Sequence, residues 1–450
     1  MLDMKRDGTA KCRGCKRGYE ENLAEADGPE FNYYAHVAEL KAVRAAVLRP
    51  NRRERLLAIK DVRTAFLQSL PYPDGKVKHV KFYDPVTKKW RYFVQSGPIY
   101  GENSAPAHWG EGTLAPYLID EQGCNFKRGD NHKSVYYNKQ KDLLMLTYVD
   151  DLMLDGHKSP VIWCDKKIDS RFDCKPLEIL VAGSSIDFIG MEVIMTIDRI
   201  YISMEAYIEK MVRELTEMGL VLCKREVSMP LTGPINVDGD SPSLSPKDTR
   251  LLLTGNGCCA WLSQTVRVDG SHSFSRVGQH ASNPTVDALD ALTHMVSYFY
   301  QHKDLCLSQP LYIEDVDHSI NMSPDIEGQL GFHFYCDTDH ASNHETQNKM
   351  RSQNGFVFMI GEGCFDWCSK ASSIAFATPL IGEAHADTNT GAVETYGTAN
   401  TTHDLLNTCY LYQEAGMEFP LPFTLLTDNT TAEAFCKETV RRSKLCKHRR

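Results

Sequence analysis

The sequence predicts a mixed chain of helices and strands with more than one domain, and three observations support this class. Short apolar segments flank two adjacent carboxylates in TYVDDLMLDG, residues 147–156. An amphipathic helix with a glycine stop is predicted over 205–220. From residue 328 onward, strands and helices alternate as in an α/β domain. A length of 450 residues corresponds to about two to four domains of ordinary size.

Composition places the chain among globular proteins, with 42% hydrophobic and 24% charged residues. No stretch approaches the ~18 apolar residues of a membrane span, and the first residues lack the apolar core of a secretory signal. Fifteen cysteines without such a signal indicate a reducing compartment and free thiols. The net charge of -9 provides no general attraction to nucleic acid, so any such site must be a local basic groove.

In chain order, the first half predicts helices and strands in alternation. Residues 35–48 are expected to be helical, 56–62 to form a strand and 64–70 a short helix. Residues 76–97 predict two hairpin strands separated by DPVTKK. Residues 104–123 predict a helix that ends near Gly123.

The second half begins with two runs of short strands, 133–156 and 185–204. The helix over 205–220 follows, and residues 228–248 are rich in Pro, Ser, Gly and Asp. That composition makes 228–248 the best linker candidate. A helical region is expected from there to about residue 308.

Asp150 and Asp151 lie between two apolar runs that predict buried strands. One interpretation is a surface turn, because Asp is common in turns and strand–turn–strand fits the flanks. The other is a metal site, because a divalent cation cancels the repulsion between adjacent carboxylates. These residues alone leave both interpretations open.

Asp61 follows RLLAIK and so also lies at a predicted strand end. Together with Asp150 and Asp151 it is able to hold two divalent cations. Two metals about 3.5–4 Å apart stabilise the attacking and leaving oxygens of a phosphoryl displacement. Carboxylate ligands suit Mg²⁺ or Mn²⁺.

At this point the sequence resembles the reverse transcriptase and RNase H region of copia-type retrotransposon polyproteins over nearly its whole length. The motifs that carry the resemblance occur in the family's order and at about its spacing. In this sequence they are KCRGCKRGYEE, DVRTAFLQS, IYGENSAPAHW, YVDD, DFIGMEV, ISMEAYIEKMVREL and ASNPTVDALDALTHMVSYFYQHKDLCL. Each motif alone is weak, whereas the ordered set is specific.

The resemblance implies an α+β right-hand polymerase of fingers, palm and thumb, followed by an α/β RNase H-like domain. It implies that Asp61, Asp150 and Asp151 bind two Mg²⁺ or Mn²⁺ ions, which align a primer 3′-hydroxyl with the α-phosphate of a dNTP. The implied domains are fingers and palm over 1–202, thumb and connection over 203–325, and the RNase H-like domain over 326–450. The implied partners are an RNA template, a DNA primer, an RNA–DNA hybrid and dNTP, without a membrane.

Five further residues receive roles from the resemblance. Phe66 would stack beneath the sugar and exclude a 2′-hydroxyl, and Arg13 would contact the triphosphate. Tyr100 and Gly101 would pack near nucleotide and template, and Lys175 would donate a proton to pyrophosphate. Structural alternatives stay open, because Phe66 fits a core position and Arg13 fits a solvated surface charge.

CRGC, residues 12–15, also raises the question of zinc. A structural zinc site needs four ligands, and no second ligand pair at finger spacing follows. The resemblance places both cysteines on an ordinary finger strand.

In the C-terminal region the resemblance makes Asp337 and Asp428 catalytic, metal-binding carboxylates of the RNase H-like domain, which would again hold two ions. Glu383 fits the family's local pattern for the glutamate, and Glu394 fits the distance to Asp428 better. Glu383 is preferred slightly. Arg450 stands where a fourth carboxylate is expected, so the domain reads as truncated or decayed.

The polymerase half departs from the family pattern as well. GENSAP replaces a segment that usually carries a lysine and serine-proline, and Gly14 replaces an apolar residue in the finger strand. These changes are expected to weaken nucleotide binding without touching the metals.

Three functions follow as hypotheses: an RNA-directed DNA polymerase of a copia-type retrotransposon, a decayed relic that at most binds nucleic acid, and an unrelated metal hydrolase. The third leaves the ordered N-terminal motifs unexplained. The expected location is cytoplasmic, in a virus-like particle, or nuclear, and not secreted. The sequence leaves the oligomeric state unknown.

Overall fold

The computed structural model describes most of the chain in two units. The described residues are 2–4, 10–12, 14–21, 30–49, 52, 54–84, 86–235, 241–312, 331–339, 352–372, 390–429 and 433. Unit 1 comprises residues 1–42, 54–179 and 411–417, and unit 2 comprises 43–53, 180–410 and 418–450.

Unit 1 is built on a six-stranded antiparallel sheet with strand order β10-β3-β9-β8-β7-β6. Its strands are β3 (Arg55–Asp61), β6 (Lys127–Arg128), β7 (Val135–Asn138), β8 (Leu143–Tyr148), β9 (Asp151–His157) and β10 (Glu178–Ile179). The three central strands β3, β9 and β8 are almost entirely buried. Their apolar runs therefore form the floor on which the carboxylates at the strand ends are placed.

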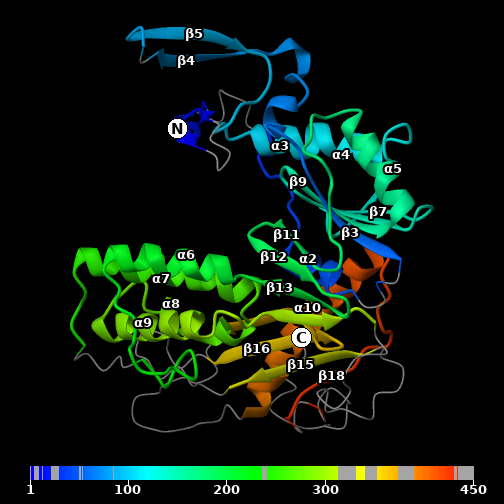
Figure 1. The fold of residues 1–450 in the computed structure, drawn as a ribbon. Coiled ribbons are helices and arrows are strands. Elements are labelled where there is room, and N and C mark those ends of the chain that lie inside the picture. The colour runs from blue at the N-terminus through cyan, green and yellow to red at the C-terminus, as the bar shows by residue number, and fades with distance from the viewer. Residues whose placement is uncertain are drawn as a thin grey trace. The chain divides into compact units, whose positions relative to one another are not determined.

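Helices cover one face of this sheet (Figure 1). They are α3 (Ala105–Trp109), the π-helical turn η4 (Gly110–Leu114), α4 (Ala115–Ile119) and α5 (Lys158–Asp169). Trp109, Leu118 and Ile168 from these helices pack with Met145 and Leu154 of the sheet in one core. The helices therefore cover the face of the sheet that is opposite to the face on which Asp61 lies.

Several short elements complete unit 1. A two-stranded hairpin joins β4 (Lys78–Asp84) to β5 (Lys89–Gln95), and β1 (Leu2–Met4) pairs with β2 (Ala10–Cys12). The 3₁₀ turns are η1 (Gly18–Glu20), η2 (Ala65–Gln68) and η3 (Pro73–Gly75). The helix α2 (Leu40–Val47) begins in unit 1 and ends in unit 2.

Unit 2 contains a four-stranded antiparallel sheet and a group of helices. The sheet has the order β11 (Ser184–Phe188), β12 (Met191–Met195), β13 (Arg199–Ser203) and β14 (Leu307–Pro310). The helices are α6 (Glu205–Met218), α7 (Pro246–Thr265), η5 (Val268–Gly270), α8 (Ser271–Gly278) and α9 (Val286–Gln301). Figure 1 shows α6, α7, α8 and α9 lying side by side, and they contact one another through their apolar faces.

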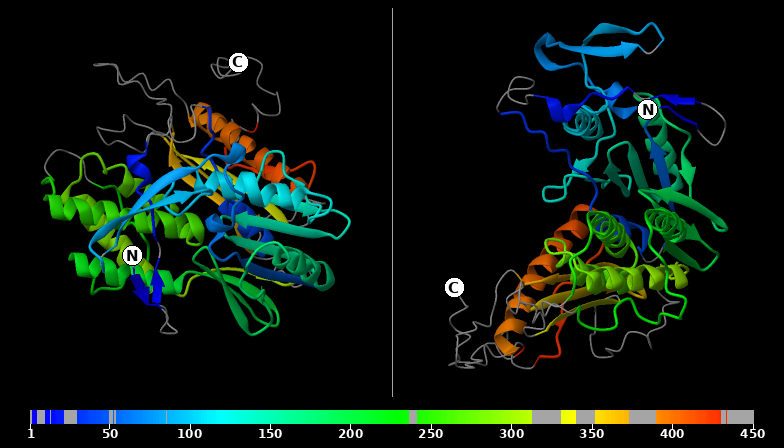
Figure 2. Two further views of the ribbon diagram at one scale, coloured as in Figure 1. Left: turned by 90° about the horizontal axis from the view of Figure 1, so that it is seen from above. Right: turned by 90° about the vertical axis from the view of Figure 1, so that its left-hand side faces the viewer.

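A second sheet of unit 2 has the order β17-β16-β15-β18. Its strands are β15 (Phe332–Thr338), β16 (Gln353–Ile360), β17 (Gly363–Ala371) and β18 (Leu425–Leu426). The first three are antiparallel, and β18 is parallel to β15. The long helix α10 (Thr390–Glu414) lies against this sheet (Figure 2) and runs from unit 2 into unit 1.

Two predicted helices differ in detail from the structure. The helix expected over 35–48 begins at Leu40, because the preceding residues extend along β8, where the Ala38 N–H donates to the Thr147 carbonyl at 2.9 Å. The helix expected over 104–123 ends at Ile119 and contains the π turn η4. Pro116 lacks the N–H that would continue regular α-helical bonding through this turn.

The two units are compact groups of residues, and the domain boundaries expected from the sequence stay a prediction. The chain passes from unit 1 to unit 2 near residue 180, and unit 2 contains both the helical region and the C-terminal sheet. The predicted linker, 228–248, lies within unit 2 and its last residues begin α7. Within the described ranges, no helix is both long and apolar enough to cross a lipid bilayer.

Candidate functional site

The hairpin β8–β9 brings two of the predicted carboxylates to one end of the unit 1 sheet. In the β3–β9 register Asp61 lies directly opposite Asp151. Asp150 occupies the two-residue turn between β8 and β9 with Val149. The strand–turn–strand prediction for these residues is therefore confirmed, and it places Asp150 next to the pair.

The turn is held from two sides. Val149 has φ +56°, a conformation that a β-branched residue rarely adopts. The Trp109 indole N–H donates to the Val149 carbonyl at 2.6 Å, and the Val62 N–H donates to the Asp150 carbonyl at 2.9 Å. Strain of this kind persists only where the surroundings fix the backbone, and it is typical of functional turns.

Electrostatics at this end of the sheet are dominated by like charges. Burial, together with the charges of the nearby Asp150 and Asp61 carboxylates, raises the pKa of Asp151 to about 6. Lys175 opposes this effect: its Nζ donates to Asp61 Oδ2 at 2.5 Å, and that hydrogen bond raises the pKa of Lys175. The main-chain N–H of Lys175 also donates to the Asp61 carbonyl at 2.9 Å.

The opposite side of β3 carries a buried cation that the sequence analysis did not single out. Lys60 is buried and pairs with Asp165 at 2.6 Å and Asp169 at 2.7 Å, both from α5. Successive residues of a strand point to opposite faces, so Lys60 faces the helices while Asp61 faces away. The ion pairs fix β3 against α5 and thereby fix the direction of Asp61.

Phe66, Tyr100 and Gly101 meet beside this end of the sheet. The Phe66 and Tyr100 rings have centroids 5.2 Å apart, and both side chains are partly exposed. Phe66 also packs against the core of unit 1, which fits the core interpretation, and its role at the site stays a prediction. Gly101 has φ +81°, and a Cβ there would lie 2.1 Å from the Lys16 carbonyl oxygen, so a side chain does not fit.

Arg13 and Glu383 lie outside the described residues. Lys447, His448 and Arg450, on which the expectation of a missing carboxylate depends, also lie outside them. Cys15 is exposed and free.

A second carboxylate cluster lies in unit 2. Asp337 is the next-to-last residue of β15, Glu394 lies in the second turn of α10 and Asp428 follows β18. One oxygen of each lies within 4.8 Å of the others. Across the described ranges this is the one set of three such groups; Asp61, Asp150 and Asp151 do not approach one another as closely. Of the two glutamates left open by the sequence, Glu394 is thus the one found beside Asp337 and Asp428.

The environment of Glu394 resembles that of Asp151. Its burial, together with the charges of Asp337 and Asp428, raises its pKa to about 7. A backbone hydrogen bond from Thr338 opposes the shift. Close packing places the helix: a Cβ at Gly397 would lie 1.9 Å from Thr338 Oγ1, so α10 approaches β15 where α10 has no side chain.

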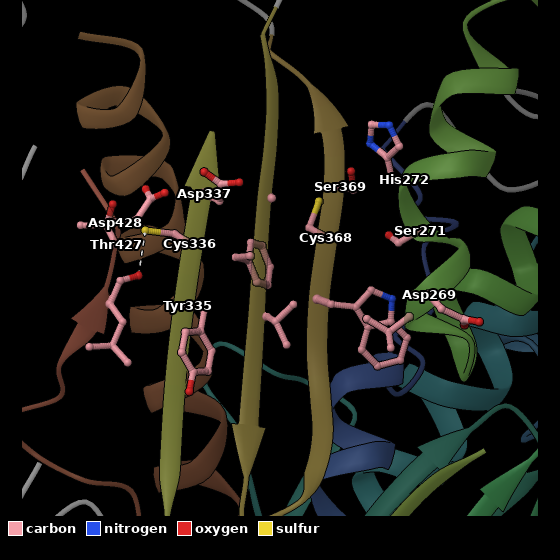
Figure 3. A pocket seen from close by; sticks show the side chains of 16 residues that line it. Asp269, Ser271, His272, Tyr335, Cys336, Asp337, Cys368, Ser369, Thr427 and Asp428 are labelled. Atoms are coloured by element: carbon pink, nitrogen blue, oxygen red, sulfur yellow. Dashed lines mark hydrogen bonds between the residues drawn. The ribbon is translucent and has the colours of Figure 1, made fainter. Parts of the chain in front are cut away.

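A pocket of about 630 Å³ opens beside this cluster within unit 2 (Figure 3). Its floor is the row Tyr335, Val357 and Trp367, which are paired across three strands. Asp337 and Asp428 lie at one end, as Figure 3 shows, and Asp269 and His272 line it from η5 and α8.

Both clusters fit divalent cations by the chemistry of their donors. Each offers three carboxylates, the ligands that Mg²⁺ and Mn²⁺ prefer. In each, burial and the charges of neighbouring carboxylates raise the pKa of one member, and a cation would relieve the repulsion between the carboxylates.

A comparison with family models matches residues 2–226, half of the chain, to the family described as reverse transcriptase (RNA-dependent DNA polymerase). No curated protein was found to match the sequence.

Two solved structures illustrate the structural comparison. The native protease-reverse transcriptase of prototype foamy virus is 12% identical, with a TM-score of 0.27 over 92% of this chain and 42% of that chain. Telomerase from Candida albicans in complex with a TWJ fragment of telomeric RNA is 10% identical, with a TM-score of 0.23 over 61% of this chain and 50% of that chain. The chain thus spans less than half the length of the foamy virus protein. TM-scores below 0.5 establish no shared fold, so the assignment rests on the sequence match.

Proposed function

Because the chain belongs to the reverse transcriptase family, we propose that it is an RNA-directed DNA polymerase of a copia-type retrotransposon. It would extend a DNA primer with dNTP on an RNA template. The observation that carries the proposal is the pairing of Asp61 with Asp151 across β3 and β9, with Asp150 in the adjoining turn. The match over residues 2–226 covers all three aspartates.

In this proposal Asp61, Asp150 and Asp151 hold two Mg²⁺ or Mn²⁺ ions. Bound there, the ions would supply charge stabilisation to the attacking 3′-oxygen and the leaving pyrophosphate oxygen. Lys175, whose Nζ donates to Asp61 Oδ2 at 2.5 Å, would be the proton donor to pyrophosphate.

Phe66 and Tyr100 form the floor for the deoxyribose in this proposal, since their rings touch and both retain exposed surface. Gly101 leaves the backbone free to approach the base pair closely. Arg13 is assigned to the triphosphate by the resemblance alone. The basic and aromatic hairpin β4–β5, with exposed Tyr83, Trp90 and Tyr92, suits single-stranded template.

Primer extension tests the polymerase. Purified protein is given an RNA template, a DNA primer, dNTP and Mg²⁺ or Mn²⁺, beside the variant Asp150→Asn. Extension by the parent and none by the variant is expected, because Asn removes a charged ligand but keeps the side-chain volume. A folded parent that binds template-primer without extending it would favour the catalytically decayed relic instead.

A second activity is favoured by the cluster Asp337, Glu394 and Asp428. We propose that this cluster binds two divalent cations and hydrolyses RNA in an RNA–DNA hybrid. Three antiparallel strands, a helix bearing the glutamate and a strand parallel to the first support an RNase H-like fold. This proposal takes Glu394 rather than Glu383 as the glutamate.

Cleavage of a labelled RNA–DNA hybrid distinguishes the two glutamates. Glu394→Gln is expected to abolish cleavage, as Asp428→Asn should, whereas Glu383→Gln should retain it. The opposite pattern would assign the role to Glu383. A parent that leaves the hybrid intact while extending primers would restrict the activity to the polymerase.

A further inference from the structure

Glu102 is a buried carboxylate in the segment that joins the β4–β5 hairpin to α3. Only 3% of its surface is exposed. A buried carboxylate is costly unless hydrogen bonds satisfy its oxygens. The partners of Glu102 therefore reveal what the segment is attached to.

Five groups from unit 1 converge on this carboxylate. The Tyr72 hydroxyl donates to both oxygens at 2.8 Å, the Gln95 amide donates at 2.5 Å and the Ser104 hydroxyl at 3.1 Å. Lys78 forms an ion pair with it, and the Ile99 N–H donates at 3.4 Å. Lys78 and Gln95 are the opposed first and last residues of the hairpin, so Glu102 joins both strands at their base.

The same network reaches the N-terminal segment 14–21. Lys78 lies 3.8 Å from Glu21, which forms an ion pair with Lys16. The Asn103 amide donates to the Gly18 carbonyl at 2.6 Å, and the Lys16 N–H donates to the Tyr100 carbonyl at 2.8 Å. Two lysines and two glutamates balance, so the network carries no net charge.

The pKa of Glu102 agrees with this arrangement. Burial alone would raise it, but the hydrogen bonds from Lys78, Tyr72 and Gln95 outweigh burial and lower it. The side chain is thus a fixed anion, and its donors fix its direction. Because groups from several segments hold the carboxylate, they also hold the main chain at Glu102 in one place.

That place determines the position of the two preceding residues. Gly101 lies against the Lys16 backbone with φ +81°, and the Tyr100 ring lies against Phe66. We propose that Glu102 is a positioning residue, which sets Tyr100 and Gly101 against Phe66 and thereby sets nucleotide affinity and the discrimination against a 2′-hydroxyl. It would act without touching the nucleotide. This inference rests on the proposed polymerase function.

The test uses a charge-balanced variant so that folding and positioning are separated. Glu102→Leu with Lys78→Met removes both partners of the ion pair and leaves neither charge buried alone. A misplacement of about 1 Å in an active site lowers the reaction rate by up to about 100-fold. The expected result is a dNTP KM raised about tenfold or more, a kcat close to that of the parent, and weaker discrimination against rNTP.

Glu111→Gln is the matched control, because Glu111 also forms an ion pair in unit 1. Arg128 donates to its two carboxylate oxygens at 2.6 and 2.7 Å. This control variant should leave dNTP KM and discrimination unchanged. A folded double variant with the parent's KM and discrimination would overturn the proposal. Should that double variant not fold, Glu102→Gln, which keeps the side-chain volume, must show the same rise in KM, and its absence would overturn the proposal equally.

A second readout does not depend on polymerase activity. Amide hydrogen exchange of residues 97–103 should speed up in the Glu102 variants relative to β8 and β9, and not in Glu111→Gln. A parent without primer extension would contradict the proposed function, whereas this exchange would still report the positioning role. Unchanged exchange in 97–103 would contradict the positioning role whether or not the parent is active.

Discussion

Single residues at the unit 1 site carry charges that oppose folding. Asp151 is partly buried beside Asp150 and Asp61, and this burial together with their charges raises its pKa to about 6. Because the pKa of this carboxyl is higher in the folded than in the unfolded state, the folded protein loses stability as the pH rises from about 4 to 6. Above that range the loss is complete. Sites of this kind trade stability for function.

We therefore expect Asp151→Asn to stabilise the metal-free protein at pH 8. After solvent screening the gain is about 1 kcal/mol, which raises the unfolding temperature by about 2–4 °C. The advantage should disappear between pH 6 and pH 4, where the parent carboxyl becomes protonated. Thermal unfolding followed by circular dichroism across this range measures it. Equal melting temperatures for parent and variant at pH 8 would contradict the expected repulsion.

Excess Mg²⁺ provides the control for that measurement. Ligand that binds the folded state raises its melting temperature, so the ion should stabilise the parent more than Asp151→Asn.

The positions of Asp61, Asp150 and Asp151 at strand ends could be predicted from the sequence, because each stands at the end of a local apolar run. The buried partners of β3 and of GENSAP were not. Lys60 looks like an ordinary surface lysine until α5 supplies Asp165 and Asp169, more than 100 residues away. Glu102 likewise receives Tyr72, 30 residues before it. Such pairings depend on tertiary contacts that carry no local signal.

Among the elements, α10 places Glu394 near β15 by packing closely against that strand at Gly397. Gly397 faces Thr338, the residue after Asp337, and a Cβ would lie 1.9 Å from Thr338 Oγ1 and 3.1 Å from its Cβ. Gly397→Ala should push the helix away and separate Glu394 from Asp337 and Asp428. We expect Mn²⁺ affinity at this cluster to fall about 10-fold or more, as for changes just outside a metal's ligands.

Thr338→Ala in the same chain supplies the matched control, since it removes the atom that meets the new methyl group. The pair of substitutions should recover most of the affinity that Gly397→Ala loses. Isothermal titration with Mn²⁺, in a background of Asp150→Asn to weaken the other cluster, measures the difference. Parental affinity in Gly397→Ala would show that the helix tolerates the methyl group without moving Glu394.

Element boundaries show which signals the sequence carries. Strong alternation and apolar runs predicted β8, β9 and the hairpin β4–β5, and a glycine stop predicted the end of α6 at Met218. The interrupted helix near Gly110 and the late start of α2 were not predicted, because a missing proline N–H and a main-chain bond to β8 decide them. The sequence slightly preferred Glu383, and the place of Glu394 beside Asp337 and Asp428 became visible only with the structure of α10, which supports the proposal made above for Glu394.

For the molecule as a whole, the two carboxylate clusters lie in different compact units. Substitutions at sites that share no interaction partners are expected to be additive. Asp150→Asn should therefore abolish primer extension while hybrid cleavage persists, and Asp428→Asn should do the reverse. Both reactions measured on each variant, with Asp150→Asn/Asp428→Asn as the inactive reference, check this. Loss of both activities in a folded single variant would reveal coupling between the sites.

Side chains along β3 point alternately to the two faces of the sheet, and this alternation affects how reliably the strands pair in the correct register. A slip of one residue relative to β9 would turn every β3 side chain to the other face. Lys60 would then point at Asp150 and Asp151, and Asp61 would be buried facing Asp165 and Asp169. The opposite charges of the adjacent residues Lys60 and Asp61 thus favour a single register of β3 against β9.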